Sequence, residues 1–172
     1  VLDLNTGTGG NNNTATFTEN GSAVAFSSGA TNLSDVDSTT YDKLTLSFTQ
    51  SNFPDGSSEQ LVFNGASSGG TLGSLGTLSA GSGSVVISSV TYDYSITVSS
   101  GVATLVFTGA SGAELTQSQA ETLVDSLRYN NTAVLPTTGS NRVFSLTPTD
   151  GSALDGNTAT FTVTVQTINH AP

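Results

Sequence analysis

The sequence predicts an all-β fold, an antiparallel Greek-key β-sandwich with one short α-helix inserted into it. The first observation is a series of short segments in which apolar and polar residues alternate and β-branched residues are frequent, the pattern of half-buried strands. The second is that clusters of Gly, Ser, Asn and Asp separate these segments, as turns do. The third is that one segment alone has the three-and-four spacing of an amphipathic helix. Many short strands joined by turns favour two packed antiparallel sheets.

Strands are predicted where the alternation is cleanest. Leu44, Leu46 and Phe48 lie two residues apart and face one side of a strand, and the segment 161–165 repeats this pattern near the C-terminus. Each of these two strands therefore needs one buried face. The strands predicted along the chain are residues 14–19, 22–26, 43–50, 59–63, 85–89, 95–99, 102–108, 142–148 and 158–167.

One helix is predicted over residues 116–129. Thr116 can cap the first turn, and Gln119 can reach back to the backbone of Thr116, which is the capping-box arrangement. The apolar positions that follow, three and four residues apart, predict a core-facing side made of Ala120, Leu123, Val124 and Leu127. The helix is expected to lie across an end or an edge of the sandwich.

The segment 65–84 is rich in Gly and Ser and is predicted to be an excursion from the sandwich. Its regular feature is a leucine at every third position, Leu72, Leu75 and Leu78. We expect a flexible loop whose leucines hold it against the core.

The length of 172 residues suits a single module over residues 1–172 with one hydrophobic core. The chain has no Cys, so packing and bound metal have to supply the stability that disulfides give many exported domains. Its residue usage is typical of an extracellular protein, at a bacterial cell surface or secreted. The chain is expected to be a segment of a longer polypeptide.

The charge balance argues against two classes of partner. Thirteen acidic residues against three basic ones give a formal net charge of −10. Nucleic acid is bound through Lys and Arg, which replace the counterions of the phosphates, so nucleic-acid binding is not expected. An anionic membrane surface is disfavoured for the same reason, and no apolar run is long enough to span a bilayer.

Three aspartates form the candidate metal site. Asp35 and Asp37 are two residues apart in a polar segment, so both carboxylates can turn toward one ion. Asp150 precedes Gly151 in a predicted turn and is expected to reach the same end of the molecule. Each aspartate taken singly is best explained by a capping or turn role. Together they offer hard oxygen ligands of the kind that calcium prefers.

The C-terminal sequence FTVTVQTINHAP, residues 161–172, resembles the end of bacterial cadherin-like repeats, which close with a valine-alternating strand and an Asn-Asp-Ala-Pro linker. The segments 14–21, 33–38 and 150–151 are similar to the first strand, the Asp-x-Asp loop and the Asp-Gly turn of the same family. The predicted helix resembles a variant of that fold found in proteoglycan-type repeats. Such repeats belong to large RTX-type surface adhesins, and the resemblance implies a cadherin- or immunoglobulin-like sandwich.

The resemblance also implies two calcium sites, each shared with an adjacent module of the same polypeptide. Asp35, Asp37 and Asp150 would serve the N-terminal junction, and Glu19 and Asn169 would serve the C-terminal junction. His170 stands where the family linker usually has Asp, and imidazole is a poor calcium ligand. The implied function is a calcium-binding adhesin module that rigidifies or extends a surface protein.

A second function stays open, a module of the same adhesin that binds a cell-surface peptide or glycan. The chain is longer than a simple sandwich repeat, and its helix, its Gly/Ser segment and its tyrosines supply material for a site. The tyrosines are Tyr41, Tyr92, Tyr94 and Tyr129.

Enzymatic activity is not expected. The acidic pairs Asp55 with Glu59 and Glu121 with Asp125 have the composition of a glycosidase pair, but the chain has no Trp for a sugar platform. Glu121 and Asp125 are expected on the solvated side of the helix. The single His lacks the surroundings of a catalytic triad, and zinc sites draw on Cys or on several His.

Overall fold

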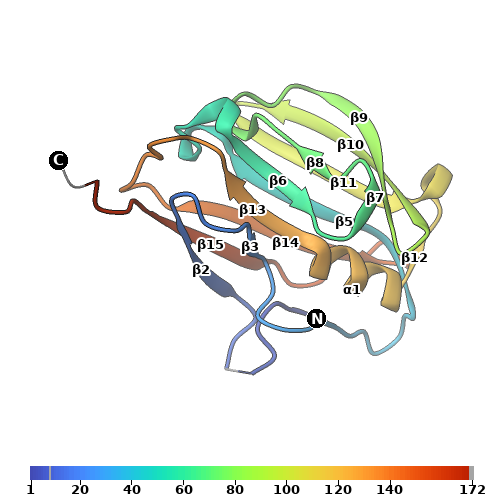
Figure 1. Cartoon of the computed structure of the whole chain (residues 1–172). Coiled ribbons are helices and arrows are strands. Elements are labelled where there is room, and N and C mark those ends of the chain that lie inside the picture. The colour runs from blue at the N-terminus through green and yellow to red at the C-terminus, as the bar shows by residue number, and fades with distance from the viewer. Residues whose placement is uncertain (8, 171–172) are drawn as a thin grey trace.

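The computed structural model describes residues 1–7 and 9–170, and two β-sheets packed face to face dominate it (Figure 1). The larger sheet has nine strands. Neighbouring strands in it are antiparallel, except that the first two strands in the order given next run parallel to each other. Its order is β2 (Asn13–Thr18), β15 (Ala159–Gln166), β14 (Arg142–Asp150), β5 (Thr40–Thr49), β11 (Val102–Gly109), β10 (Val90–Ser99), β9 (Gly81–Ile87) and β7 (Ala66–Ser68), with β12 (Leu115–Thr116) paired to β5.

The smaller sheet has four strands, and a separate two-stranded ribbon lies at the N-terminus. The order of the small sheet is β3 (Val24–Ala25), β13 (Leu127–Asn131), β6 (Glu59–Phe63) and β8 (Thr71–Leu72). The ribbon pairs β1 (Leu2–Asp3) with β4 (Asn32–Leu33). Four single 3₁₀ turns complete the described elements: Gln50–Asn52, Gly56–Ser58, Leu75–Thr77 and Ala110–Gly112.

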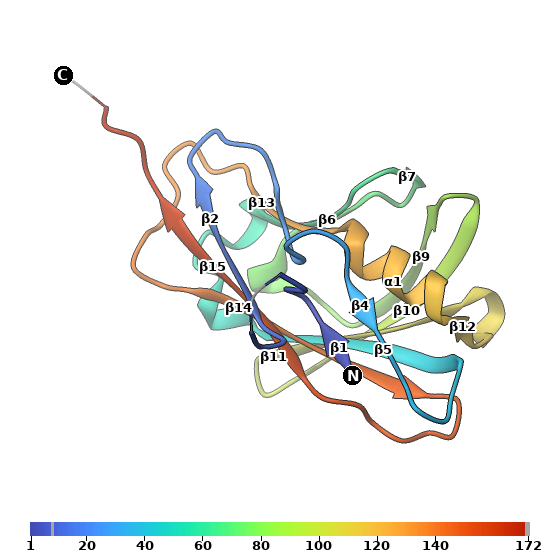
Figure 2. The same ribbon diagram turned by 90° about the horizontal axis from the view of Figure 1, so that it is seen from below.

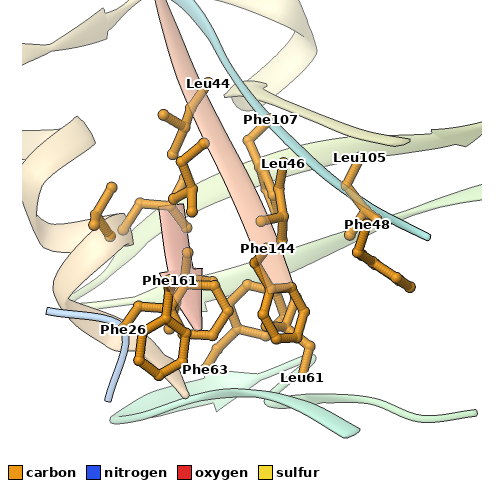
Figure 3. Packing of buried hydrophobic residues seen from close by; sticks show 14 of the residues in the cluster. Phe26, Leu44, Leu46, Phe48, Leu61, Phe63, Leu105, Phe107, Phe144 and Phe161 are labelled. Atoms are coloured by element: carbon orange, nitrogen blue, oxygen red, sulfur yellow. The ribbon is translucent and has the colours of Figure 1, made fainter. Parts of the chain in front are cut away.

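The core lies between the two sheets, as the strand alternation predicts. Leu44, Leu46 and Phe48 of β5 are all buried on one face. Phe144 of β14 lies among them, and Figure 3 shows its ring reaching toward Leu61 of β6 across the sandwich. Full burial of each such side chain contributes about 1.5–3 kcal/mol. The predicted all-β sandwich with one short helix is therefore confirmed.

The described residues contain one α-helix, α1 (Gln117–Ser126), and its N-terminus has the predicted capping box. The Thr116 hydroxyl accepts from the backbone N–H of Gln119, and the Gln119 side chain accepts from the backbone N–H of Thr116. The predicted end at residue 129 is wrong, because Leu127 takes an extended conformation and begins strand β13. Leu127 is fully buried all the same, as the apolar spacing predicted.

The segment 65–84 is more regular than the predicted flexible excursion. It forms β7, β8, a 3₁₀ turn and the start of β9, so the Gly/Ser-rich chain extends both sheets at one edge. Leu75 is fully buried, and Leu72 and Leu78 pack against the core from partly buried positions. The three leucines thus hold the segment in place as expected.

The two ends of the sandwich carry different connections. The chain after β15 leaves at one end, while the β4–β5 and β14–β15 connections lie toward the other, on the side of the N-terminus (Figure 2). No helix in the described part of the chain has the length and apolar character needed to cross a bilayer.

Candidate metal site

Three aspartates from two separate parts of the chain meet at the end of the sandwich that lies on the side of the N-terminus. Asp35 and Asp37 lie on the connection from β4 to β5, and Asp150 is the last residue of β14. One carboxylate oxygen from each lies within 4.8 Å of the others. Asp35 and Asp37 are exposed and Asp150 is buried. The structure therefore brings together the three aspartates named from the sequence, in a group that could hold a metal ion.

Asp150 is held rigidly by its own turn. Its Oδ1 accepts hydrogen bonds from the backbone N–H groups of Ser152 at 2.8 Å and Leu154 at 2.9 Å. These two bonds occupy one carboxylate oxygen. A Cβ at Gly151 would lie 2.7 Å from the Thr40 hydroxyl oxygen, so a larger residue here would force the Thr40 side chain to shift. The turn thus fixes the one buried carboxylate of the group.

The loop that carries Asp35 and Asp37 is anchored just before it begins. The Glu121 carboxylate of α1 accepts a 3.0 Å hydrogen bond from the backbone N–H of Leu33, and the backbone nitrogen of Val1 donates to the backbone carbonyl of Ser34. Within the loop, the Asp35 carboxylate accepts from the backbone N–H of Asp37 at 3.2 Å. The N-terminal residue and helix α1 therefore both set where this loop starts.

The interaction between the Asp35 and Asp37 carboxylates favours a bound cation. A hydrogen bond from the Asp37 side chain lowers the pKa of Asp35. The same hydrogen bond, together with repulsion from the Asp35 and Asp150 charges, raises the pKa of Asp37. Neighbouring carboxylates resist simultaneous ionisation unless a positive charge compensates them. A cation between them would supply that charge.

Tyr41 is a fourth residue of this region, although the sequence suggested for it only a role among the tyrosines of a peptide or glycan site. It is 2% exposed, and its hydroxyl oxygen is buried without a hydrogen-bond partner among the described residues. Tyr41 pairs with Asp150 across β5 and β14. Burial raises the pKa of Tyr41, and the charges of Asp35, Glu121 and Asp150 raise it further. A buried hydroxyl without a partner is uncommon and requires an explanation.

The chemistry of the donors fits a hard cation. All three carboxylates offer oxygen, the ligand that calcium and magnesium prefer. Calcium takes six to eight oxygens, so water, backbone carbonyls or a neighbouring segment would supply the rest. Glu114 adds negative charge nearby, since its carboxylate lies 3.4 Å from the place where a Cβ on Gly151 would stand.

Glu19 and Asn169, the residues expected at the second junction, are not drawn into a comparable group. The Glu19 carboxylate is buried and accepts from the backbone N–H of Ile168 at 3.1 Å, while its other oxygen lies 2.8 Å from Nε2 of His170. Asn169 is exposed. In the described residues the one group of three or more potential ligands is that of Asp35, Asp37 and Asp150. The Glu19 carboxylate instead holds the chain that follows β15.

The acidic pair Asp55 and Glu59 belongs to a buried ion-pair network. Arg142, whose side chain is fully buried, places Nε 2.6 Å from the Glu59 carboxylate and Nη2 3.1 Å from the Asp55 carboxylate. The Tyr129 hydroxyl donates to Glu59 at 2.7 Å, and the Asn131 amide donates to Asp55 at 2.7 Å. Both carboxylates are thus occupied by neighbours that tie β6 to β13 and β14.

The expectation that Glu121 and Asp125 face water is wrong, because both are half-buried and hold the chain before the aspartate loop. Asp125 accepts from the backbone N–H of Thr31 at 2.8 Å and from the Ser27 hydroxyl at 3.1 Å. Glu121 accepts from Leu33, as described above. The i to i+4 spacing placed both on one face of α1, but residues 27–33 cover that face.

An open pocket of about 240 Å³ lies between the C-terminal half of α1 and the turns that follow β6 and β9. Its lining is mostly polar: Asn64, Gly65, Ile87, Ser88, Thr122, Asp125 and Ser126. None of the four tyrosines lines it. Tyr41, Tyr92 and Tyr129 are buried in the core, so these three of the four tyrosines suggested for a ligand site do not line the surface.

Comparison with known proteins adds no family assignment. No family model, no curated protein and no solved structure matches the chain.

Proposed function

We propose that the chain is a calcium-binding module of an extracellular bacterial adhesin, which stiffens or extends the surface protein that contains it. The observation that carries the proposal is the convergence of Asp35, Asp37 and Asp150 within 4.8 Å at one end of the sandwich. The resemblance of the chain ends to cadherin-like repeats supports the same function. Adjacent modules of the polypeptide would be its partners.

Calcium suits this group better than other cations. Zinc and copper sites draw on Cys and His, whereas the chain has no Cys and its one His lies at the C-terminal end. Magnesium demands near-ideal octahedral geometry and gives up its waters reluctantly, while calcium accepts irregular sets of oxygens. Extracellular modules bind calcium with dissociation constants of about 10⁻⁴ to 10⁻³ M, which extracellular calcium suffices to fill.

A bound ion would add a direct link between the β4–β5 loop and the end of β14, in addition to the existing pairing of strands β5 and β14. This link would lie next to the N-terminal residue that contacts Ser34. Any segment that precedes Val1 would start beside the ion. The ion would therefore fix the direction in which such a segment leaves the sandwich, which is the mechanical role of a calcium site in an extended adhesin.

Thermal unfolding tests the proposal. Millimolar calcium should raise the melting temperature relative to excess chelator, because an ion that binds only the folded state stabilises it by mass action. Magnesium at the same concentration should have a much smaller effect. Melting curves that superimpose with calcium and with chelator would remove the basis for a calcium site in this chain.

A peptide- or glycan-binding module is the second candidate, and the pocket beside α1 favours it. Its polar lining of hydroxyl, amide and carboxylate groups is compatible with a small polar ligand. A spacer is expected in tandem copies along its parent polypeptide, whereas a ligand binder is expected once. The number of copies in the full-length protein therefore separates the two functions.

A further inference from the structure

The Tyr41 hydroxyl is a buried polar group whose place the fold alone does not explain. Among the described residues it has no hydrogen-bond partner. Tyr92, the other tyrosine near α1, is also buried, but its hydroxyl donates to the backbone carbonyl of Gln119 at 3.0 Å. Leaving a buried hydroxyl unpaired costs about 1–3 kcal/mol, so a phenylalanine would serve the core better than this tyrosine.

The position of Tyr41 relates its hydroxyl to the aspartate group. Tyr41 faces Asp150 across β5 and β14, at the point where a bulge shifts the strand register. On its other side Tyr41 pairs with Leu115, the residue before the helix cap Thr116. Tyr41 therefore lies between the end of β14 and β12, which leads into the N-terminus of α1.

We propose that Tyr41 is a positioning residue of the cation site, whose hydroxyl donates a hydrogen bond to an oxygen of the coordination shell, a ligand carboxylate or a water on the ion. This inference rests on the proposed calcium site. Groups that orient metal ligands from outside the first shell typically change metal affinity by about 10- to 100-fold when they are removed. A single neutral donor belongs at the lower end of that range.

The hydroxyl acts as a donor and not as an anionic ligand. A tyrosine hydroxyl has an ordinary pKa of about 10, so the phenol is protonated at neutral pH. A protonated phenol beside several carboxylates has its hydrogen as the useful group. Once the ion fixes the shell oxygens, the hydroxyl gains the partner that it otherwise lacks.

Tyr41→Phe separates this role from a structural one. In chelator the variant should be as stable as the wild type or more stable, because it removes an unpaired buried hydroxyl. In calcium it should bind about 10-fold more weakly and gain less in melting temperature. Tyr92→Phe is the matched control, since it loses a paired hydroxyl and should be destabilised equally with calcium and with chelator.

Terbium luminescence gives an independent readout of position. Tb³⁺ also prefers hard oxygen ligands, and its emission is sensitised by a nearby excited tyrosine; the chain has four Tyr and no Trp. Tyr41→Phe should remove most of the sensitised emission at saturating Tb³⁺, while Tyr92→Phe should leave more of it.

Three results are decisive. Equal calcium affinity and equal Tb³⁺ emission in Tyr41→Phe and the wild type would overturn the role of Tyr41 and leave the calcium site standing. Failure of Tyr41→Phe to fold in chelator would also overturn it, since the hydroxyl would then be needed without an ion. A wild type that binds neither Ca²⁺ nor Tb³⁺ would overturn both the inference and the proposed function.

Discussion

The carboxylate of Glu121 accepts a 3.0 Å hydrogen bond from the backbone N–H of Leu33, two residues before Asp35. This bond connects the helix to the loop that carries two of the three clustered aspartates. Asp125, one turn further along α1, holds Thr31 in the same way. The helix thus acts on the candidate metal site through the backbone of residues 31–33, although no helical side chain belongs to the cluster.

Glu121→Ala should therefore affect both stability and calcium binding. It leaves a half-buried backbone donor without its partner, which costs about 1–3 kcal/mol. Glu121→Gln keeps an acceptor oxygen and should cost less. Urea unfolding in chelator measures the first effect and a calcium titration the second. If Glu121→Ala binds calcium like the wild type, the helix does not position the loop.

Leu127→Ala should cost about 2–5 kcal/mol in the free energy of unfolding, through lost burial and the cavity left behind. Leu127 is fully buried where α1 passes into β13. Leu135 is 66% exposed, so Leu135→Ala is the matched control and should change stability by no more than about 0.5 kcal/mol. Denaturant unfolding of the two variants side by side checks this, and equal costs would contradict the described packing.

Arg142→Met should be among the most damaging substitutions in the chain. It leaves the fully buried Glu59 carboxylate without its positive partner, and breaking a buried pair in this way costs about 3–5 kcal/mol. Adding Glu59→Gln removes the uncompensated charge, so the double variant should be less unstable than the sum of the two single variants. A strictly additive double-mutant cycle would show that the two side chains do not interact.

Acid should lower the free energy of unfolding, in part because it protonates the Asp55 carboxylate. Burial acts to raise the pKa of Asp55, but hydrogen bonds from Thr137 and Asn131 and the charge of Arg142 outweigh it and lower the pKa below the usual aspartate value. A lowered pKa contributes stability that is present above about pH 4 and is lost as pH falls through the folded-state value. The stability difference between the wild type and Asp55→Asn should therefore shrink below about pH 4. A difference that stays constant down to pH 2 would contradict this.

The sandwich could be predicted from the sequence because its signals are local and repeated. The alternation of Leu44, Leu46 and Phe48 gives the buried face directly, and the capping box at Thr116 marks the helix start. The helix end could not be predicted, because Leu127 suits a buried position in either structure. Leu127 pairs with Phe63 of β6, more than 60 residues earlier in the chain, and this long-range pairing makes Leu127 part of a strand and not of the helix.

The candidate site was predictable only in part. Asp35, Asp37 and Asp150 stand in polar turn segments, and their residue types identify them. Glu121 and Tyr41 could not be found in this way. Helical spacing put Glu121 opposite the core, and the sequence does not show that residues 27–33 pack over that side. Nothing in the sequence indicates that Tyr41 lies beside the aspartates. Its pairing with Asp150 and its unpaired hydroxyl, which relate it to the site, appear only in the structure.

A calcium titration of the wild type, Asp37→Asn and Asp42→Asn by calorimetry tests the central claim most directly. Asp42 is a suitable control because its side chain is 47% exposed and pairs only loosely with Lys43, at 4.0 Å. The calcium-site account predicts millimolar or tighter binding to the wild type, clearly weaker binding to Asp37→Asn, and wild-type binding to Asp42→Asn. No heat of calcium binding to the wild type, or equal weakening in both variants, would contradict a calcium site at Asp35, Asp37 and Asp150.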